Sequence, residues 1–304
     1  MPSRREILLA PAALAAAGTR SGAAAAAAGK MTLGLHHNTS SGAGYQASLE
    51  GWARAGIRQV EIANNLLDAF LKTETLAAAR RVLTDNGLTA VSASCGVGGL
   101  IEPNPDRAAA FDRLKRRCEM LATLGLTRTY ATTATTARPT ADDYTAAAGH
   151  MRTAGDIAAQ FQLTMMFEFV RQSSFAATLP TLLRIVRAAA HPNTGVLFDC
   201  YHFWSGHNRL EDLDQLRPGD VKHVHFQDVE DIPREMLDLT TRVMPGDGVA
   251  PLVAILRALA DKAAYTGPLS VELFAPRFQT RDPYEIAREI VPKAEAVMRR
   301  ATVL

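Results

Sequence analysis

The chain has few cysteines, no marked excess of charge of either sign and no nucleotide-binding fingerprint. Three cysteines without a Cys-x-x-Cys pair are not the pattern of a disulfide framework or of a zinc site built from thiolates. The 33 lysines and arginines against 31 acidic residues give a formal net charge of +2, which is not typical of a protein that binds nucleic acid. No glycine-rich phosphate loop is present. The composition that remains, with 47% hydrophobic and 21% charged residues among 304, is that of a globular protein.

The first 30 residues differ in composition from the rest of the chain. Arg4 and Arg5 precede an apolar run over residues 7–17, and an alanine-rich stretch over residues 23–28 follows. This order resembles a twin-arginine export signal, and a run of about 11 residues is too short to span a bilayer. We therefore expect residues 1–30 to be a signal peptide, with the protein exported to the periplasm or the medium. A disordered alanine-rich leader on a cytoplasmic protein is the alternative.

From residue 31 onward, short apolar segments alternate with longer amphipathic ones. Eight segments have the length and residue types of strands, namely residues 32–36, 59–62, 89–94, 128–131, 163–169, 195–199, 221–226 and 269–273. Eight others have helical periodicity, namely residues 47–55, 73–86, 108–124, 141–161, 179–190, 210–216, 249–261 and 283–300. This alternation predicts parallel strands with helical crossovers, and eight units predict one α/β domain, a (β/α)8 TIM barrel, over residues 31–304. A doubly wound open sheet is the alternative.

Acids and a histidine stand at the ends of four later strands of this predicted barrel: Glu168, Asp199, His225 and Glu272. Because the active site of such barrels lies at the C-terminal ends of the strands, we expect these side chains to converge. Each alone could be a buried ion-pair partner, but four together favour a shared metal. Three carboxylates and one imidazole predict one divalent ion, Mn²⁺ in preference to Mg²⁺, Co²⁺ or Zn²⁺. We expect His223 and Cys200 to be structural.

These strand ends resemble the xylose-isomerase-like barrel superfamily, which includes sugar phosphate isomerases and epimerases, inosose dehydratases and type IV apurinic endonucleases. The matching segments are residues 167–169, 198–202, 223–228, 245–248 and 271–274. The resemblance implies that Glu168, Asp199, His225 and Glu272 are metal ligands. It also implies substrate contacts by His202 and Arg277, and by Arg234, around which the spacing departs from the family's. The endonuclease branch is disfavoured because residues 245–250 lack a histidine.

The resemblance further implies a divalent-metal-dependent sugar isomerase or epimerase. Glu168 and Glu272 would abstract and return a proton of a keto-sugar or related polyol through a metal-stabilised enediolate. A lyase or dehydratase, either like inosose dehydratase or a 3-keto-glycoside deglycosidase, would use the same metal and base, and a non-catalytic carbohydrate-binding barrel is a third alternative. We expect a small sugar or cyclitol as the partner, no nucleic acid and no stable membrane span. A homo-oligomer or a partner subunit stays open.

Overall fold

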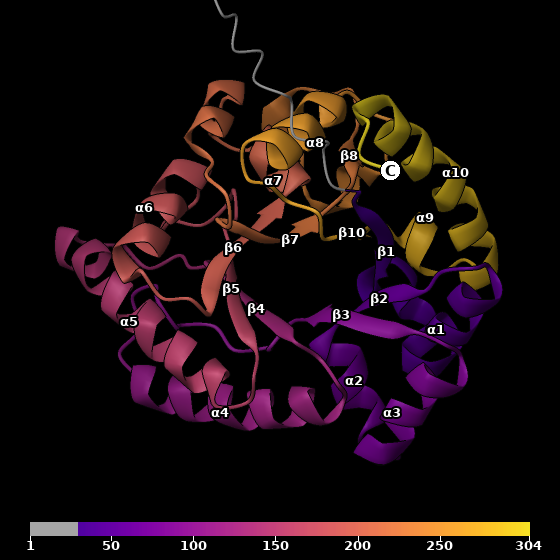
Figure 1. Ribbon diagram of the computed structural model, residues 1–304, viewed down its shortest axis with the longest axis horizontal. Helices are drawn as coiled ribbons and strands as arrows, with labels where there is room; N and C mark the ends of the chain where they lie inside the picture. The colour runs from indigo at the N-terminus through magenta and orange to yellow at the C-terminus, as the bar shows by residue number, and fades with distance from the viewer. Residues whose placement is uncertain (1–29) are drawn as a thin grey trace, which may run out of the picture.

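The computed structural model describes residues 30–304, so the export signal expected over residues 1–30 lies outside the described residues except for Lys30. Eight parallel strands form a ring with helices outside it (Figure 1). The strands are β1 (Thr32–His36), β2 (Gln59–Ile62), β3 (Thr89–Ala93), β4 (Arg128–Thr132), β5 (Thr164–Glu168), β6 (Thr194–Asp199), β7 (Val221–His225) and β10 (Pro268–Val271). The predicted TIM barrel is confirmed, and the predicted strand bounds agree with these to within about two residues.

The order of the strands around the sheet is β3-β2-β1-β10-β7-β6-β5-β4. The two ends of this order meet at a parallel bridge between Ser94 and Tyr130. There the Cys95 amide donates to the Tyr130 carbonyl at 2.9 Å. The sheet therefore closes into a barrel, which places the C-terminal ends of all its strands around one opening.

The helices form the outer ring. They are α1 (Gly44–Arg54), α2 (Asn64–Phe70), α3 (Leu76–Asp85), α4 (Arg107–Thr123), α5 (Ala141–Ala159), α6 (Leu179–Ala189), α7 (Cys200–Ser205), α8 (Leu252–Asp261), α9 (Pro276–Gln279) and α10 (Pro283–Ala301). The last long helix, α10, packs beside α1, so the outer ring closes as well (Figure 1). Within residues 30–304, no helix has both the length and the apolar character that a membrane crossing requires.

The shorter elements differ most from the expectation. The helix predicted over residues 210–216 is the 3-10 helix η2 (Leu210–Gln215), and that predicted from residue 73 begins at Leu76 because the Thr75 hydroxyl caps the amide of Ala78. A two-stranded antiparallel sheet of β8 (Asp228–Val229) and β9 (Arg242–Val243) was not predicted. The other 3-10 helices are η1 (His37–Ala43), η3 (Arg234–Met236) and η4 (Leu239–Thr241).

Successive side chains of a strand alternate between two apolar regions, the main core between strands and helices and a separate cluster on the other face of the strands. On β5, Met165 and Phe167 pack in the main core between strands and helices. Met166 packs instead with Tyr130 and Leu197 in a separate apolar cluster. Glu168 lies two residues beyond Met166, and successive side chains of a strand alternate between its faces. The face that is apolar within the barrel therefore ends in a carboxylate at the barrel opening.

Two helical glycines should respond in opposite ways to an added methyl group, because only Gly51 lies in the contact between α1 and α10. A Cβ at Gly51 would lie 2.7 Å from the Cβ of Pro283, whereas a Cβ at Gly149 on α5 would meet only the end of Arg152 at 3.7 Å. We expect Gly51→Ala to lower the free energy of unfolding by about 1–3 kcal/mol through overpacking. Gly149→Ala should raise it by up to about 1 kcal/mol through helix propensity. Urea unfolding of both variants measures this, and shifts of the same sign would contradict the packing described here.

Candidate metal centre

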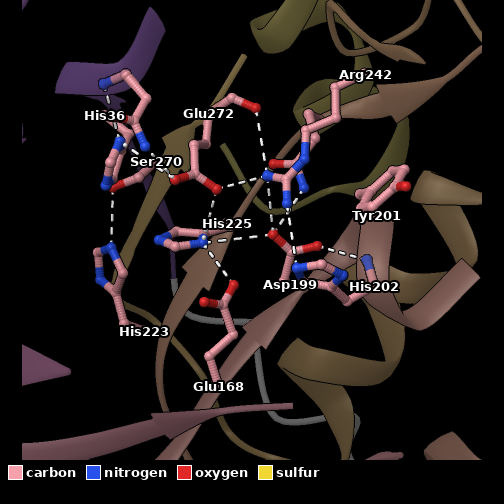
Figure 2. A network of polar contacts seen from close by, with 12 residues as sticks. His36, Glu168, Asp199, Tyr201, His202, His223, His225, Arg242, Ser270 and Glu272 are labelled. Atoms are coloured by element: carbon pink, nitrogen blue, oxygen red, sulfur yellow. Dashed lines mark hydrogen bonds and ion pairs between the residues drawn. The ribbon is translucent and has the colours of Figure 1, made fainter. Parts of the chain in front are cut away.

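The structure brings together the four side chains that the sequence singled out as ligands. Around the Nδ1 atom of His225 lie the Oε1 atom of Glu168 at 3.0 Å, the Oε2 atom of Glu272 at 3.3 Å and the Oδ2 atom of Asp199 at 3.4 Å (Figure 2). One ligand atom from each of the four residues lies within 4.8 Å of the others. None of the four residues is more than 4% exposed.

This donor set fits a divalent cation. Three carboxylates buried in one place repel one another, and burial of each charge costs several kcal/mol unless a counter-charge is near. A divalent ion removes this penalty and is bound by carboxylate oxygens and neutral imidazole nitrogens. The four residues can therefore hold one divalent metal ion at the opening of the barrel.

The ends of the strands place the ligands. Glu168, Asp199 and His225 are the last residues of β5, β6 and β7, and Glu272 directly follows β10. Asp199 lies opposite His225 in the register of β6 and β7. It also caps α7, since its Oδ1 atom accepts from the His202 amide at 2.6 Å. The ligands thus sit on rigid elements, which fixes their spacing before any ion binds.

Arg242 is a residue of this centre that the sequence analysis missed. Its Nη1 atom lies 2.5 Å from the Oε2 atom of Glu272 and 3.1 Å from the Oδ2 atom of Asp199. Its guanidinium carbon lies 4.7 Å from the ring centroid of Tyr201 and 4.9 Å from that of Phe274, and the residue is 1% exposed. β9 carries it, and a two-residue strand is too short to show periodicity. The folded hairpin is therefore what brings this cation to the carboxylates.

Three further residues at the site were also missed: His36, Glu61 and Tyr130. The His36 Nδ1 atom lies 3.4 Å from Glu272, and its Nε2 atom lies 3.1 Å from the Tyr130 hydroxyl. Glu61 contacts His225 from the side away from the three carboxylates, at 3.2 Å from its Nε2 atom. His36 and Glu61 each lie within one residue of the C-terminal end of a predicted strand. The rule that identified the four ligands, applied to the early strands, would have found both.

The three predicted substrate contacts occupy different environments. His202 lines the pocket at the centre, with its Nε2 atom 3.3 Å from Arg242, and burial lowers the pKa of its ring to about 4. Arg234 instead stacks on the ring of Trp204 at 4.5 Å, and Arg277 pairs with Glu230 at 2.6 Å. Neither of these arginines lines the pocket, so the expected contacts of Arg234 and Arg277 with substrate do not follow from their positions.

The pocket at the barrel opening has a volume of about 260 Å³. Its lining is mixed. Besides Glu168, Glu272, His36 and His202, it includes neutral groups that form hydrogen bonds, namely Asn38, Asn64, Asn65, Ser94, Tyr130, Thr132 and Gln172, and the apolar side chains of Ala63, Ala134, Val170, Leu239 and Phe274. Among the described residues that line it, Arg242 alone carries a permanent positive charge. Such a lining suits a small ligand with many hydroxyl groups.

The two glutamates of the centre differ in proton affinity. Burial raises the pKa of Glu168 to about 7, with a smaller contribution from the neighbouring carboxylates. Burial acts on Glu272 in the same direction, but the positive charges of His225, His36 and Arg242 hold its pKa below the usual value. Burial acts to lower the pKa of His225, yet the carboxylates around it, led by Glu272, raise it well above 6.5. Glu272 is therefore the stronger candidate for an ionised base, and Glu168 for a group that carries a proton.

Comparison with known proteins adds relatives of two activities. The chain is 32% identical over 124 residues to an inosose isomerase of Halalkalibacterium halodurans, which covers 40% of this chain and 44% of that protein. It is 26% identical over 129 residues to a 3-dehydroshikimate dehydratase of Bacillus anthracis, covering 40% of this chain and 45% of that protein. The matched part thus spans about half the length of the curated relatives.

Structures and family models agree on the fold. The crystal structure of the IolI protein with a bound zinc atom superimposes with a TM-score of 0.81 at 22% identity, covering 89% of this chain and 99% of that chain. The family model described as xylose isomerase-like TIM barrel matches residues 49–295. Because this match includes seven of the eight barrel strands and all four ligands, the chain belongs to the xylose isomerase-like TIM barrel family.

Proposed function

We propose that the protein is a divalent-metal-dependent isomerase or epimerase of a keto-sugar or cyclitol. The observation that carries the proposal is the pair Glu168 and Glu272, which share one buried set of candidate ligands and both line a small pocket with several hydrogen-bonding groups. The inosose isomerases among the relatives support this reaction class. Mn²⁺ is our first choice of ion for an oxygen-rich set, with Zn²⁺, which the IolI structure holds, as the next.

The ligands Glu168, Asp199, His225 and Glu272 would hold the ion. When bound, the ion would supply a Lewis acid that polarises a substrate carbonyl and makes the neighbouring C–H more acidic. Glu272, kept ionised by the cations around it, takes the proton from that carbon. Glu168 is the second carboxylate at the substrate and would be the group through which the proton returns, since in the metal-free protein its raised pKa of about 7 makes it the one of the two glutamates that takes up a proton more readily. Return to the opposite face yields an epimer, and return to the neighbouring carbon yields an aldose–ketose isomer.

The other pocket residues bind and orient the substrate. Arg242 and the neutral ring of His202 lie side by side at the pocket wall and would bind hydroxyl or carbonyl oxygens. A volume of about 260 Å³ lies just below the usual range of ligand pockets and suits a single six-carbon ring. A phosphate group would find no lysine and no second arginine among the described lining residues. We therefore propose an unphosphorylated monosaccharide or cyclitol as substrate.

A dehydratase is the second candidate, because one relative is a 3-dehydroshikimate dehydratase. The same base would remove a proton beside the carbonyl, and the substrate would then lose a hydroxyl group from the next carbon instead of regaining a proton. Glu168 would suit that step too, because a carboxyl that has taken up a proton can donate it to the leaving hydroxyl. The two reactions therefore differ in products and not in the groups required.

We expect the metal-loaded protein in D₂O to introduce deuterium beside the carbonyl of at least one member of a panel of keto-sugars and inososes. Glu168→Gln and Glu272→Gln, each at saturating metal, should slow this exchange by about 10²–10⁴-fold. Glu230→Gln, which changes an acid paired with Arg277 away from the pocket, is the matched control.

NMR follows the exchange, and metal analysis of each variant separates loss of the ion from loss of the base. Absence of exchange in every substrate despite bound metal would contradict proton transfer. Loss of water from the substrate would instead assign the dehydratase.

The affinity of the centre for metal should fall as the pH is lowered, because protons compete with the ion for the buried ligands. In the metal-free protein the pKa of Glu168 is raised to about 7 and that of His225 well above 6.5, so binding an ion must displace protons. We expect the affinity for Mn²⁺ to fall about tenfold or more for each pH unit below 7. Titration calorimetry in buffers of different ionisation enthalpy counts the protons released, and an affinity that is constant from pH 8 to pH 5.5 would contradict this assignment.

The three arginines near the opening should differ in their importance. Arg242→Gln removes the counter-charge of two ligands and a pocket contact, so we expect kcat/KM to fall by about 10²-fold or more. Arg234→Gln and Arg277→Gln should change it by less than about threefold, because both side chains lie outside the pocket. Steady-state kinetics on the substrate identified by exchange measures this, with circular dichroism to check folding. An equal loss in all three variants would overturn the role given to Arg242.

A further inference from the structure

Glu61 is a buried acid that neither lines the pocket nor belongs to the four-ligand set. It lies on β2, which two strands, β1 and β10, separate from β7 in the sheet. Its side chain nevertheless reaches His225 on β7, with the Oε1 atom 3.2 Å from the Nε2 atom of that ring. The contact therefore crosses the interior of the barrel. Glu61 and His225 are both 0% exposed, so water does not compete for it.

The second oxygen of Glu61 is also held in place. Its Oε2 atom lies 2.7 Å from the Nε2 atom of His223, which in turn lies 2.9 Å from the Ser270 hydroxyl (Figure 2 shows His223 and Ser270 beside the centre). Ser270 is paired in register with His225 on the neighbouring strand. Both oxygens of the carboxylate are thus engaged, and the side chain has little freedom to move away from His225.

The two ring nitrogens of His225 face different partners. Nδ1 points to the carboxylates of the proposed metal centre, and Nε2 points to Glu61. A ligand nitrogen must offer a lone pair, so in a metal-bound ring the other nitrogen carries the proton. An ionised carboxylate only accepts hydrogen bonds, so one placed against Nε2 favours the ring with its proton there.

We propose that Glu61 is a positioning residue of the metal centre. Its carboxylate accepts the Nε2–H of His225 and thereby holds the ring in the orientation and tautomer that present Nδ1 to the ion. The inference rests on the proposed function, since it assumes that the four ligands bind a divalent ion. It assigns to Glu61 no contact with either ion or substrate.

Two other roles for Glu61 make different predictions. As a purely structural partner of His223, it would affect folding stability and leave the affinity for metal unchanged. As a ligand of a second ion, it would act with His36 and His225, since one donor atom from each of these three residues also lies within 4.8 Å of the others. Stoichiometry and affinity together separate these roles from the one proposed.

The first test is zinc binding to the full chain, measured by competition with a chromophoric chelator. We expect wild-type protein to bind one Zn²⁺ and Glu61→Gln to bind it about 10–100-fold more weakly. The matched control is Ser92→Ala, since Ser92 is paired in register with Glu61 and is also fully buried. Its hydroxyl has no hydrogen-bond partner among the described residues, so its loss should leave zinc affinity unchanged.

The second test needs no variant of Glu61 and so stands even if that variant fails to fold. In zinc-loaded protein labelled with ¹⁵N-histidine, the eight histidines give ring signals. The variants His223→Gln and His36→Gln remove the signals of two histidines that lie beside His225, which helps to assign the His225 ring. We expect the His225 ring to show zinc on Nδ1 and a slowly exchanging proton on Nε2. A proton on Nδ1, with zinc on Nε2, would overturn the proposal.

The outcomes distinguish this inference from the function on which it rests. Equal zinc affinity in wild-type protein and Glu61→Gln overturns the role of Glu61 and leaves the proposed centre intact. Failure of wild-type protein to bind any of Zn²⁺, Mn²⁺ or Co²⁺ overturns both. Two zinc ions per chain, with the second lost in Glu61→Gln and in His36→Gln, would make Glu61 a ligand and overturn the positioning role.

Discussion

The burial of several carboxylates around one imidazole is the constraint on which the rest of this molecule depends. Four acids point into the barrel near His225, and each is at most 4% exposed: Glu61, Glu168, Asp199 and Glu272. Their mutual repulsion in a region of low dielectric would be prohibitive without nearby positive charge. Arg242 supplies one such charge, and the four-ligand set can take up a divalent ion as another. The concentration of acids at this centre and its capacity to take up a cation therefore have the same cause.

The barrel provides the means to tolerate this concentration of charge. Its stability comes largely from the apolar core between strands and helices, where residues such as Phe167 and Phe198 pack. The polar interior at the C-terminal ends of the strands contributes little to that core. It can therefore hold carboxylates that repel one another, because the apolar core between strands and helices offsets the free-energy cost of burying them. Alternation along each strand keeps the two environments apart at the scale of single residues.

One metal centre of this kind is compatible with several reactions on polyhydroxylated carbonyl compounds. The relatives of this chain include an isomerase and a dehydratase, and both reactions can begin with removal of a proton beside a carbonyl group. What differs between them is where the substrate's other hydroxyl groups are held. In the function proposed for this chain, that task would fall to pocket-lining side chains that follow β1, β2 and β5, such as Asn38, Asn64 and Gln172, and to the hairpin that carries Arg242. On that proposal, substrate choice would depend on parts of the pocket that are separate from the candidate ligands.

The sequence by itself determined the barrel strands and singled out the four candidate ligands, because both depend on local patterns. Apolar runs of strand length predicted the eight barrel strands, and an acid or histidine at the end of such a run was enough to single out Glu168, Asp199, His225 and Glu272. Only the tertiary structure decided that Arg242, and neither Arg234 nor Arg277, lies at the centre, and that Glu61 reaches His225 across the barrel. These contacts join segments far apart in the sequence. They depend on how the sheet closes and on how a long hairpin folds back, and local sequence periodicity predicts neither of these.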